Sequence, residues 1–195
     1  MNSRDKILAA VKQNQPAITA LPDINFLKGD YDEPVAKFTS TLTAIGGKVI
    51  PVKNIDDIRG YILNNKIPGA RDITTVPFLG DMMELITPET KQTHALENVD
   101  NAVIEAHFSV AENGAVWITE DRVHARVLPF ICQYLSVIVH AKSIVPTMHE
   151  AYKNIGEEKY GFGTFIAGPS KTADIEQSLV LGAHGSRTMT IFLIG

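Results

Sequence analysis

The pattern that most restricts the fold of this chain is the alternation of short apolar runs with amphipathic segments. Apolar residues recur every three or four positions in three segments, which predicts helices at 34–45, 54–65 and 147–155. Runs rich in Val, Ile and Thr separate them and predict strands at 48–52, 72–76, 135–141, 164–168 and 188–194. Strands that alternate with helices are typical of a mostly parallel sheet flanked by helices, so the sequence predicts an α/β fold.

The remaining segments are less regular. Helices are also predicted at 3–13, with Ser3 as the N-cap, and at 122–131, whereas 77–101 reads as a connection with one short helix at most. Three short strands within 102–119 stand too close together for crossover helices, which favours a local antiparallel arrangement. With no repeat or linker, and about 100 to 200 residues per domain, the sequence predicts one domain over 1–195.

Composition excludes several classes of function. The net charge is −4 and no run of Lys or Arg exceeds two residues, so nothing indicates nucleic-acid binding. The first residues are charged and lack the apolar core of a signal peptide, and no stretch approaches the roughly 18 apolar residues of a spanning helix, so we expect a cytoplasmic protein. Cys132 is the single cysteine, which cannot hold an iron–sulfur cluster, and its apolar surroundings predict a buried, inert thiol. We expect no cofactor in this chain.

Polar residues interrupt an apolar run in the stretch FSVAENGAVWIT, residues 108–119. Because an unpaired carboxylate in an apolar layer is costly, Glu112 needs a partner or a function. With Asn113 and Gly114 it forms a predicted turn between two strands. The sequence leaves three roles open for Glu112, namely a catalytic nucleophile, a ligand-binding or structural carboxylate in a cleft, and a turn residue without function.

A second candidate site lies in IAGPSKTADIEQSLVLGAHGSR, residues 166–187. A strand runs into Gly168, and an acidic helix start is predicted at Asp174, with Gln177 three residues on as in a capping box. Backbone N–H groups and hydroxyls at such a helix start can hold an anion. The residues predicted for ligand binding here are Gly168, Ser170, Lys171, Thr172, Asp174, His184, Gly185 and Arg187. Helix capping alone is the alternative for Ser170, Thr172 and Asp174.

The six histidines do not indicate a metal site. His149-Glu150 has Lys153 where a zinc motif of the H-E-x-x-H type needs its second histidine. His184 lies between Gly182 and Gly185, where a sharp turn could direct the imidazole into a cleft, although a plain turn histidine explains the pattern equally well.

These two stretches resemble the signature blocks of the LUD-domain family, in particular its lactate utilisation protein C group. The second block, GPSKTADIE followed by LGAHGSR, is the more specific one, and the segment RVLPFICQYLSVIVHAKSIVP between the blocks is also similar. Asn113 and Ala115 stand where the family commonly has Thr, and Ser186 where it commonly has Pro. The resemblance covers roughly the last 100 residues well.

The resemblance implies a fold similar to the sugar-isomerase and CoA-transferase superfamily (NagB/RpiA/CoA-transferase-like) and a place in the bacterial oxidation of L-lactate to pyruvate. In that system the partner subunits carry the iron–sulfur chemistry, in agreement with the single cysteine. AENG is also similar to the turn that carries the nucleophilic glutamate of CoA transferases.

Three hypotheses of function follow. The first is an accessory subunit of the lactate-oxidising system that binds a small organic acid or other anion, the iron–sulfur subunits, or both. The second is a transferase or isomerase that uses Glu112, and the third is a regulatory anion-binding module. For every hypothesis we expect Glu112, Ser170, Thr172, Asp174 and His184 to converge on one cleft.

Overall fold

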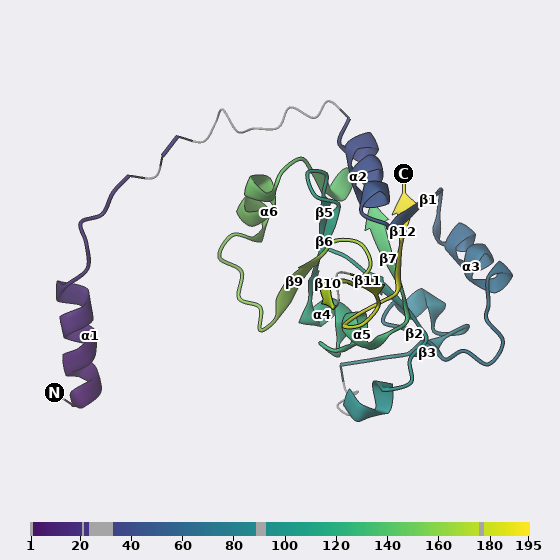
Figure 1. Ribbon diagram of the computed structural model, residues 1–195, viewed down its shortest axis with the longest axis horizontal. Helices are drawn as coiled ribbons and strands as arrows, with labels where there is room; N and C mark the ends of the chain where they lie inside the picture. Colours follow the sequence, from purple (N-terminus) through teal and green to yellow (C-terminus); the bar gives the residue numbers. More distant parts are fainter. Residues whose placement is uncertain (1, 21, 24–32, 89–92, 176–177) are drawn as a thin grey trace.

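The computed structural model describes residues 2–20, 22–23, 33–88, 93–175 and 178–195. At its centre lies a sheet of six parallel strands in the order β1-β12-β7-β4-β2-β3 (Figure 1). These strands are β1 (Lys48–Val52), β2 (Asp72–Thr74), β3 (Glu84–Leu85), β4 (Asn101–Glu105), β7 (Tyr134–His140) and β12 (Thr188–Ile194). The predicted α/β class, with a mostly parallel sheet flanked by helices, is confirmed.

A second sheet of four strands packs beside the first in the order β8-β5-β6-β9. It consists of β5 (Phe108–Val110), β6 (Ala115–Thr119), β8 (Ile144–Val145) and β9 (Gly163–Ile166). β5 and β6 are antiparallel, as predicted, but β4 is not their third partner. The chain passes from the central sheet to the second sheet between two consecutive residues. The N–H of Ala106 donates to the carbonyl of Ile138 in the central sheet, and the N–H of His107 donates to the carbonyl of Trp117 in the second.

Residues on successive positions of the central strands face opposite layers. Ile104, Val137 and Ile191 point toward the helix α2 (Pro34–Ala44) and the second sheet. Their neighbours Val103, Ile138 and Phe192 point toward the helix α3 (Ile55–Asn64) on the other face. This period of two places apolar side chains on both faces, as expected for a covered parallel sheet.

The helix α6 (Met148–Ile155) covers the outer face of the second sheet. Its buried residues Ala151 and Ile155 pack on Phe108 and Trp117. Thr147 is its N-cap and accepts a bond from the N–H of Glu150, so the predicted helix is confirmed.

Two predicted segments differ from the structure, namely the helix that follows β6 and the connection that follows β2. In place of one helix over 122–131 there are two short ones, α4 (Glu120–Val123) and α5 (Leu128–Ile131). His124 separates them because its φ of +56° is incompatible with a right-handed helix. The segment 77–101, predicted as a connection with one short helix at most, contains in its described residues two short 3-10 helices, Pro77–Leu79 and Thr93–Leu96. It also contains the central strand β3, which the sequence did not predict.

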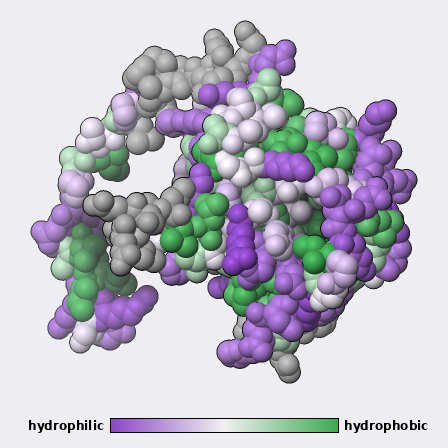
Figure 2. Space-filling model, turned by 45° about the vertical axis from the view of Figure 1, so that its right-hand side comes forward, coloured by the Kyte–Doolittle hydropathy of each residue, from purple (hydrophilic) through white to green (hydrophobic). Residues whose placement is uncertain are grey.

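The helix α1 (Ser3–Gln13) has no buried residue and lies apart from the rest of the chain in Figure 1. Its N-cap is Asn2 rather than the predicted Ser3. The apolar side formed by Ile7, Leu8 and Val11 is present as predicted, but these side chains are more than half exposed (Figure 2).

Cys132 follows α5 and is 1% exposed. Burial raises the pKa of its thiol to about 12, because a thiolate would lose hydration there. The prediction of a buried thiol is therefore confirmed, and the raised pKa disfavours the reactive thiolate.

Candidate functional site

The turn Glu112–Gly114 joins β5 to β6, and Glu112 has a structural partner. Its Oε2 accepts a hydrogen bond of 2.8 Å from the backbone N–H of Met148, the first residue of α6. Its own N–H bonds to the carbonyl of Pro146 at 3.0 Å. A carboxylate at this position accepts a bond from an N–H that would otherwise be unpaired. Its negative charge also interacts favourably with the positive end of the helix dipole. Glu112 thus stabilises α6, and its proposed role as a nucleophile stays a prediction.

Asn113 and Gly114 shape the same turn. The Asn113 side chain accepts a bond of 3.0 Å from the N–H of Ala115. Gly114 has a φ of +70°, and a Cβ there would lie 3.0 Å from Cα of Leu42 in α2. The glycine therefore serves both the backbone conformation and a close approach to α2.

The helix predicted to begin at Asp174 is absent, and this prediction is wrong. The segment forms β10 (Lys171–Ile175), which pairs antiparallel with β11 (Ser178–Leu181). Pairing of Thr172 with Val180 satisfies backbone groups that a helix would have satisfied internally. Because the described residues Lys171–Ile175 form a strand, they offer no helix start for an anion. The capping-box residue Gln177 and the side chain of Asp174 lie outside the described part of the chain.

The structure brings Thr172 and His184 of the second block together and places Ser170 and Arg187 beside two glycines of the same loop. Thr172 Oγ1 lies 3.5 Å from His184 Nδ1. A Cβ on Gly185 would lie 3.1 Å from Cβ of Ser170, and one on Gly182 would overlap Cγ of Arg187. We call the residues Ser170, Lys171, Thr172, His184 and Arg187 the hairpin cluster.

The hairpin cluster lies at the amino ends of the central strands. The N–H of Arg187 bonds to the carbonyl of Gln133, one residue before β7. Gly168, with a φ of +72°, packs on Ile45 at the end of α2. Since Val116 pairs with Ile166, the turn of Gly114 and the turn of Gly168 emerge at the same end of β6 and β9. Both signature blocks therefore contact the last turn of α2.

The opposite edge of the central sheet carries charged residues that the sequence patterns did not single out. Glu105 ends β4 and His140 ends β7. Arg122 Nη1 donates a bond of 2.7 Å to Glu105, and His140 Nε2 lies 3.8 Å from the same carboxylate. Ligands of open α/β sheets commonly bind beyond the carboxyl ends of the strands, which is this edge.

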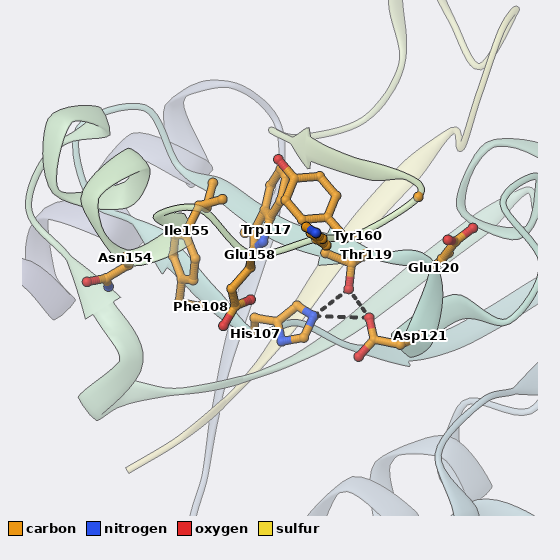
Figure 3. A pocket seen from close by; sticks show the side chains of 12 residues that line it. His107, Phe108, Trp117, Thr119, Glu120, Asp121, Asn154, Ile155, Glu158 and Tyr160 are labelled. Carbon is orange, nitrogen blue, oxygen red and sulfur yellow. Dashed lines mark hydrogen bonds and ion pairs between the residues drawn. The ribbon is translucent and has the colours of Figure 1, made fainter.

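A cavity of about 400 Å³ opens beside these residues (Figure 3). At one end His107 Nε2 lies 2.6 Å from Thr119 Oγ1 and 3.5 Å from Asp121 Oδ1. The Thr119 hydroxyl also donates to Asp121. Burial raises the pKa of Asp121, but the bond from Thr119 and the neighbouring His107 outweigh it, so the net pKa is lowered and the carboxylate is ionised near neutral pH.

A second, smaller cavity of about 220 Å³ shares Asp121 with the first and is also lined by Glu105, Arg122 and His124. His124 is the one non-glycine residue among those described that has a positive φ. With ψ at −34° and a bond from the N–H of Ala125 to the carbonyl of Val123, it forms a strained γ-turn. Strained residues gather at functional sites, so this edge is a candidate site in its own right.

The strain at His124 leads to a testable expectation. Glycine adopts positive φ without steric cost, so His124→Gly should keep or raise the free energy of unfolding, by up to about 1 kcal/mol. His124→Val should lower it by about 1 to 3 kcal/mol, because a β-branched side chain suits this conformation least. Urea unfolding of the three proteins checks this. Equal stability of the glycine and valine variants would contradict the assigned strain.

The sequence contains polar residues after two apolar runs, but only the fold shows that these residues lie at one edge. Glu105-Ala106-His107 follows one apolar run and Glu120-Asp121-Arg122 follows another. Polar residues directly after buried strands are typical of ligand-binding edges. Within the described residues no group of three or more His, Cys, Asp or Glu side chains could hold a metal ion.

Comparison with known proteins identifies the family. The sequence profile of the LUD domain matches residues 83–194, more than half of the chain. The chain is 31% identical over 104 residues to Lactate utilization protein C of Bacillus pumilus, covering 50% of this chain and 43% of that protein. It is 34% identical over 97 residues to Lactate utilization protein C of Geobacillus kaustophilus, covering 47% and 40%. The chain thus spans under half the length of these relatives.

A crystal structure of a DUF162 family protein from Deinococcus radiodurans shares the fold. It superposes with a TM-score of 0.65 at 19% identity and covers 84% of this chain and 98% of that one. In the part of the chain that the structure describes, no helix is both long and apolar enough to cross a membrane. The profile match spans both signature blocks and most of the central sheet, so the chain belongs to the LUD-domain family.

Proposed function

We propose that this protein is an accessory component of bacterial L-lactate oxidation to pyruvate and that it binds a small organic acid at the hairpin cluster. Support for the pathway comes from the relatives, which are named Lactate utilization protein C. Support for the ligand class comes from the gathering of Thr172, His184 and Arg187 around one hairpin.

The chemistry of the hairpin cluster suits a carboxylate. Lys171 and Arg187 carry positive charge and are exposed, and the hydroxyls of Ser170 and Thr172 are hydrogen-bond donors. Charge-assisted bonds to a carboxylate are stronger than neutral ones. His184 is exposed as well, whereas Ser170 and Thr172 are half-buried. The Lys171 side chain lies beside Gly46, where its Nζ would be 3.7 Å from an added Cβ.

Electron transfer belongs to other subunits in this proposal. The single Cys132 is buried and its thiol pKa is raised, which leaves no thiolate for a cluster. We therefore propose that the chain acts beside iron–sulfur subunits.

Deletion of the encoding gene tests the pathway. The deletion strain should lose growth on L-lactate as sole carbon source and keep growth on pyruvate, and a plasmid copy should restore the first. Undiminished growth on L-lactate, in a strain without a second lactate oxidase, would contradict the proposal.

Calorimetry with L-lactate and pyruvate tests the ligand site. Combining Ser170→Ala with Thr172→Ala should weaken binding about 5- to 150-fold, which corresponds to the loss of roughly 1 to 3 kcal/mol expected when bonds to a charged group are removed. The matched control combines Ser40→Ala with Thr43→Ala, since these hydroxyls bond only to backbone carbonyls of α2. Unchanged affinity in the first double variant would place the acid elsewhere.

A further inference from the structure

The cavity of about 400 Å³ at the carboxyl edge lies between the second sheet and the segment that joins α6 to β9. It is lined by β5, β6 and α4 on one side and by Asn154, Ile155 and residues 158–161 on the other. Its volume falls in the range of small-molecule sites, about 300 to 1,000 Å³. None of its lining residues belongs to the hairpin cluster, so it is independent of the organic-acid site proposed above.

The hydrogen bonds at one end of this cavity determine which nitrogen of His107 carries a proton. Asp121 is ionised and only accepts, so the single proton of the Thr119 hydroxyl goes to Asp121. The Thr119 oxygen must then accept from His107 Nε2, which lies 2.6 Å away. Neutral His107 is therefore the Nε2–H tautomer, and its Nδ1 presents a lone pair on the far side of the ring (Figure 3).

The charged groups around the cavity disfavour an anionic ligand. Asp121, Glu120 and Glu158 all line it, against the single ammonium group of Lys159. Glu120 is paired with Arg126 at 2.6 Å. Even with that pair counted as neutral, the carboxylates and the lone pair of His107 offer acceptors for hydroxyl donors and repel a carboxylate ligand.

The wall between these polar groups is aromatic. Trp117 packs against Tyr160 with ring centroids 5.4 Å apart and against Phe108 at 6.4 Å. Tyr160 is 43% exposed, so part of this aromatic surface is open to a ligand. Aromatic faces stabilise the apolar C–H surface of a ring while the polar end binds its hydroxyls.

We propose that this cavity binds a neutral, hydroxyl-bearing ring compound of about monosaccharide size. One ligand hydroxyl donates to Nδ1 of His107, others donate to Asp121 and Glu158, and the ring lies against the exposed Tyr160. Thr119 is a positioning residue, because it acts by holding the His107 tautomer.

Nitrogen-15 NMR of the histidine rings tests the positioning. Wild-type protein with a neutral His107 ring should show the Nε2–H tautomer, and Thr119→Ser should preserve it because the hydroxyl remains. Asp121 Oδ1 lies 3.5 Å from the same nitrogen, so the tautomer should lose its preference only when Thr119→Val is combined with Asp121→Leu. An Nδ1–H tautomer in the wild-type protein, or an unchanged preference in the double variant with a retained circular dichroism spectrum, would overturn the assigned hydrogen bonds.

Intrinsic fluorescence tests the ligand class, because Trp117 is the only tryptophan and lines the cavity. Glucose, ribose and inositol serve as neutral probes, and gluconate serves as the anionic match of glucose. At least one neutral probe should give a saturable change with a Kd of about 1 mM or tighter. Gluconate should bind at least about tenfold more weakly than glucose. No saturable change with any neutral probe, or gluconate binding as well as glucose, would overturn the proposal.

Two neighbouring glutamates provide a matched pair of variants for the same titration. Glu158 lines the cavity and Glu157 does not. Glu158→Gln should reduce the preference for glucose over gluconate about three- to tenfold, because it removes one repulsive charge. Glu157→Gln should leave the preference unchanged. Equal effects of the two variants would show that general surface charge, and not the cavity, sets the preference.

Discussion

Alkaline solution should destabilise the wild-type protein through Cys132 and should not do so in a Cys132→Ala variant. The thiol is 1% exposed and its pKa in the folded protein is raised from 9.0 to about 12. Below pH 9 the thiol is protonated in both the folded and the unfolded chain, so the stability contributed by its burial is fully present. Between pH 9 and 12 the unfolded chain ionises while the folded protein does not, and stability is lost as the pH rises.

The size of the effect follows from the shift. Each pH unit within this window should lower the wild-type free energy of unfolding by about 1.4 kcal/mol relative to the variant, reaching at most about 4 kcal/mol near pH 12. The contributions of other groups that titrate in this range are the same in both proteins and cancel in the difference. The cavity left by alanine lowers the free energy of unfolding by the same amount at every pH. Urea unfolding of both proteins between pH 8 and 11 measures the difference. Parallel pH profiles would contradict the raised pKa.

A single methyl group at Gly114 should destabilise the protein by about 2 to 4 kcal/mol. Gly114→Ala places a Cβ 3.0 Å from Cα and 3.1 Å from N of Leu42, which are backbone atoms of α2 and cannot rotate away. This crowding adds to the cost of a φ of +70° for a residue with a side chain. Denaturant unfolding gives the change directly.

Gly69→Ala is the control for this effect. Gly69 has a φ of +80°, but a Cβ there would meet nothing within 4 Å. This variant should therefore lose only about 1 kcal/mol, from backbone strain alone. The difference between the two variants measures the packing of the Glu112–Gly114 turn on α2. Equal losses would mean that α2 moves to accommodate the methyl group.

The neighbouring residue Glu112, which interrupts an apolar run, is explained by a contact with α6. The sequence raised the question of what compensates this carboxylate, and the backbone N–H of Met148 provides the answer from 36 residues further along the chain. No local pattern contains that partner, because α6 is held near the turn by the pairing of β8, which precedes it in the chain, with β5.

The error at Asp174 has a related cause. Asp174 and Gln177 have the spacing of a helix start, and local patterns of this kind carry little free energy. The structure instead pairs Lys171 with Leu181 in a hairpin. Which arrangement forms depends on whether a partner strand is available, and sequence spacing does not report this.

Periodicity in the sequence by itself determined the α/β class, the central strands β1, β2, β7 and β12, and the helices α2, α3 and α6. The reason is that the buried side chains of a helix or strand recur at the period of that element. Composition likewise determined the buried thiol of Cys132. Only the tertiary structure decided that β4 leaves its sequence neighbours for the central sheet, and that His107, Thr119 and Asp121 meet at its carboxyl edge. The physical reason is that strand order and side-chain contacts depend on pairings between distant segments, which leave no periodic trace in the chain.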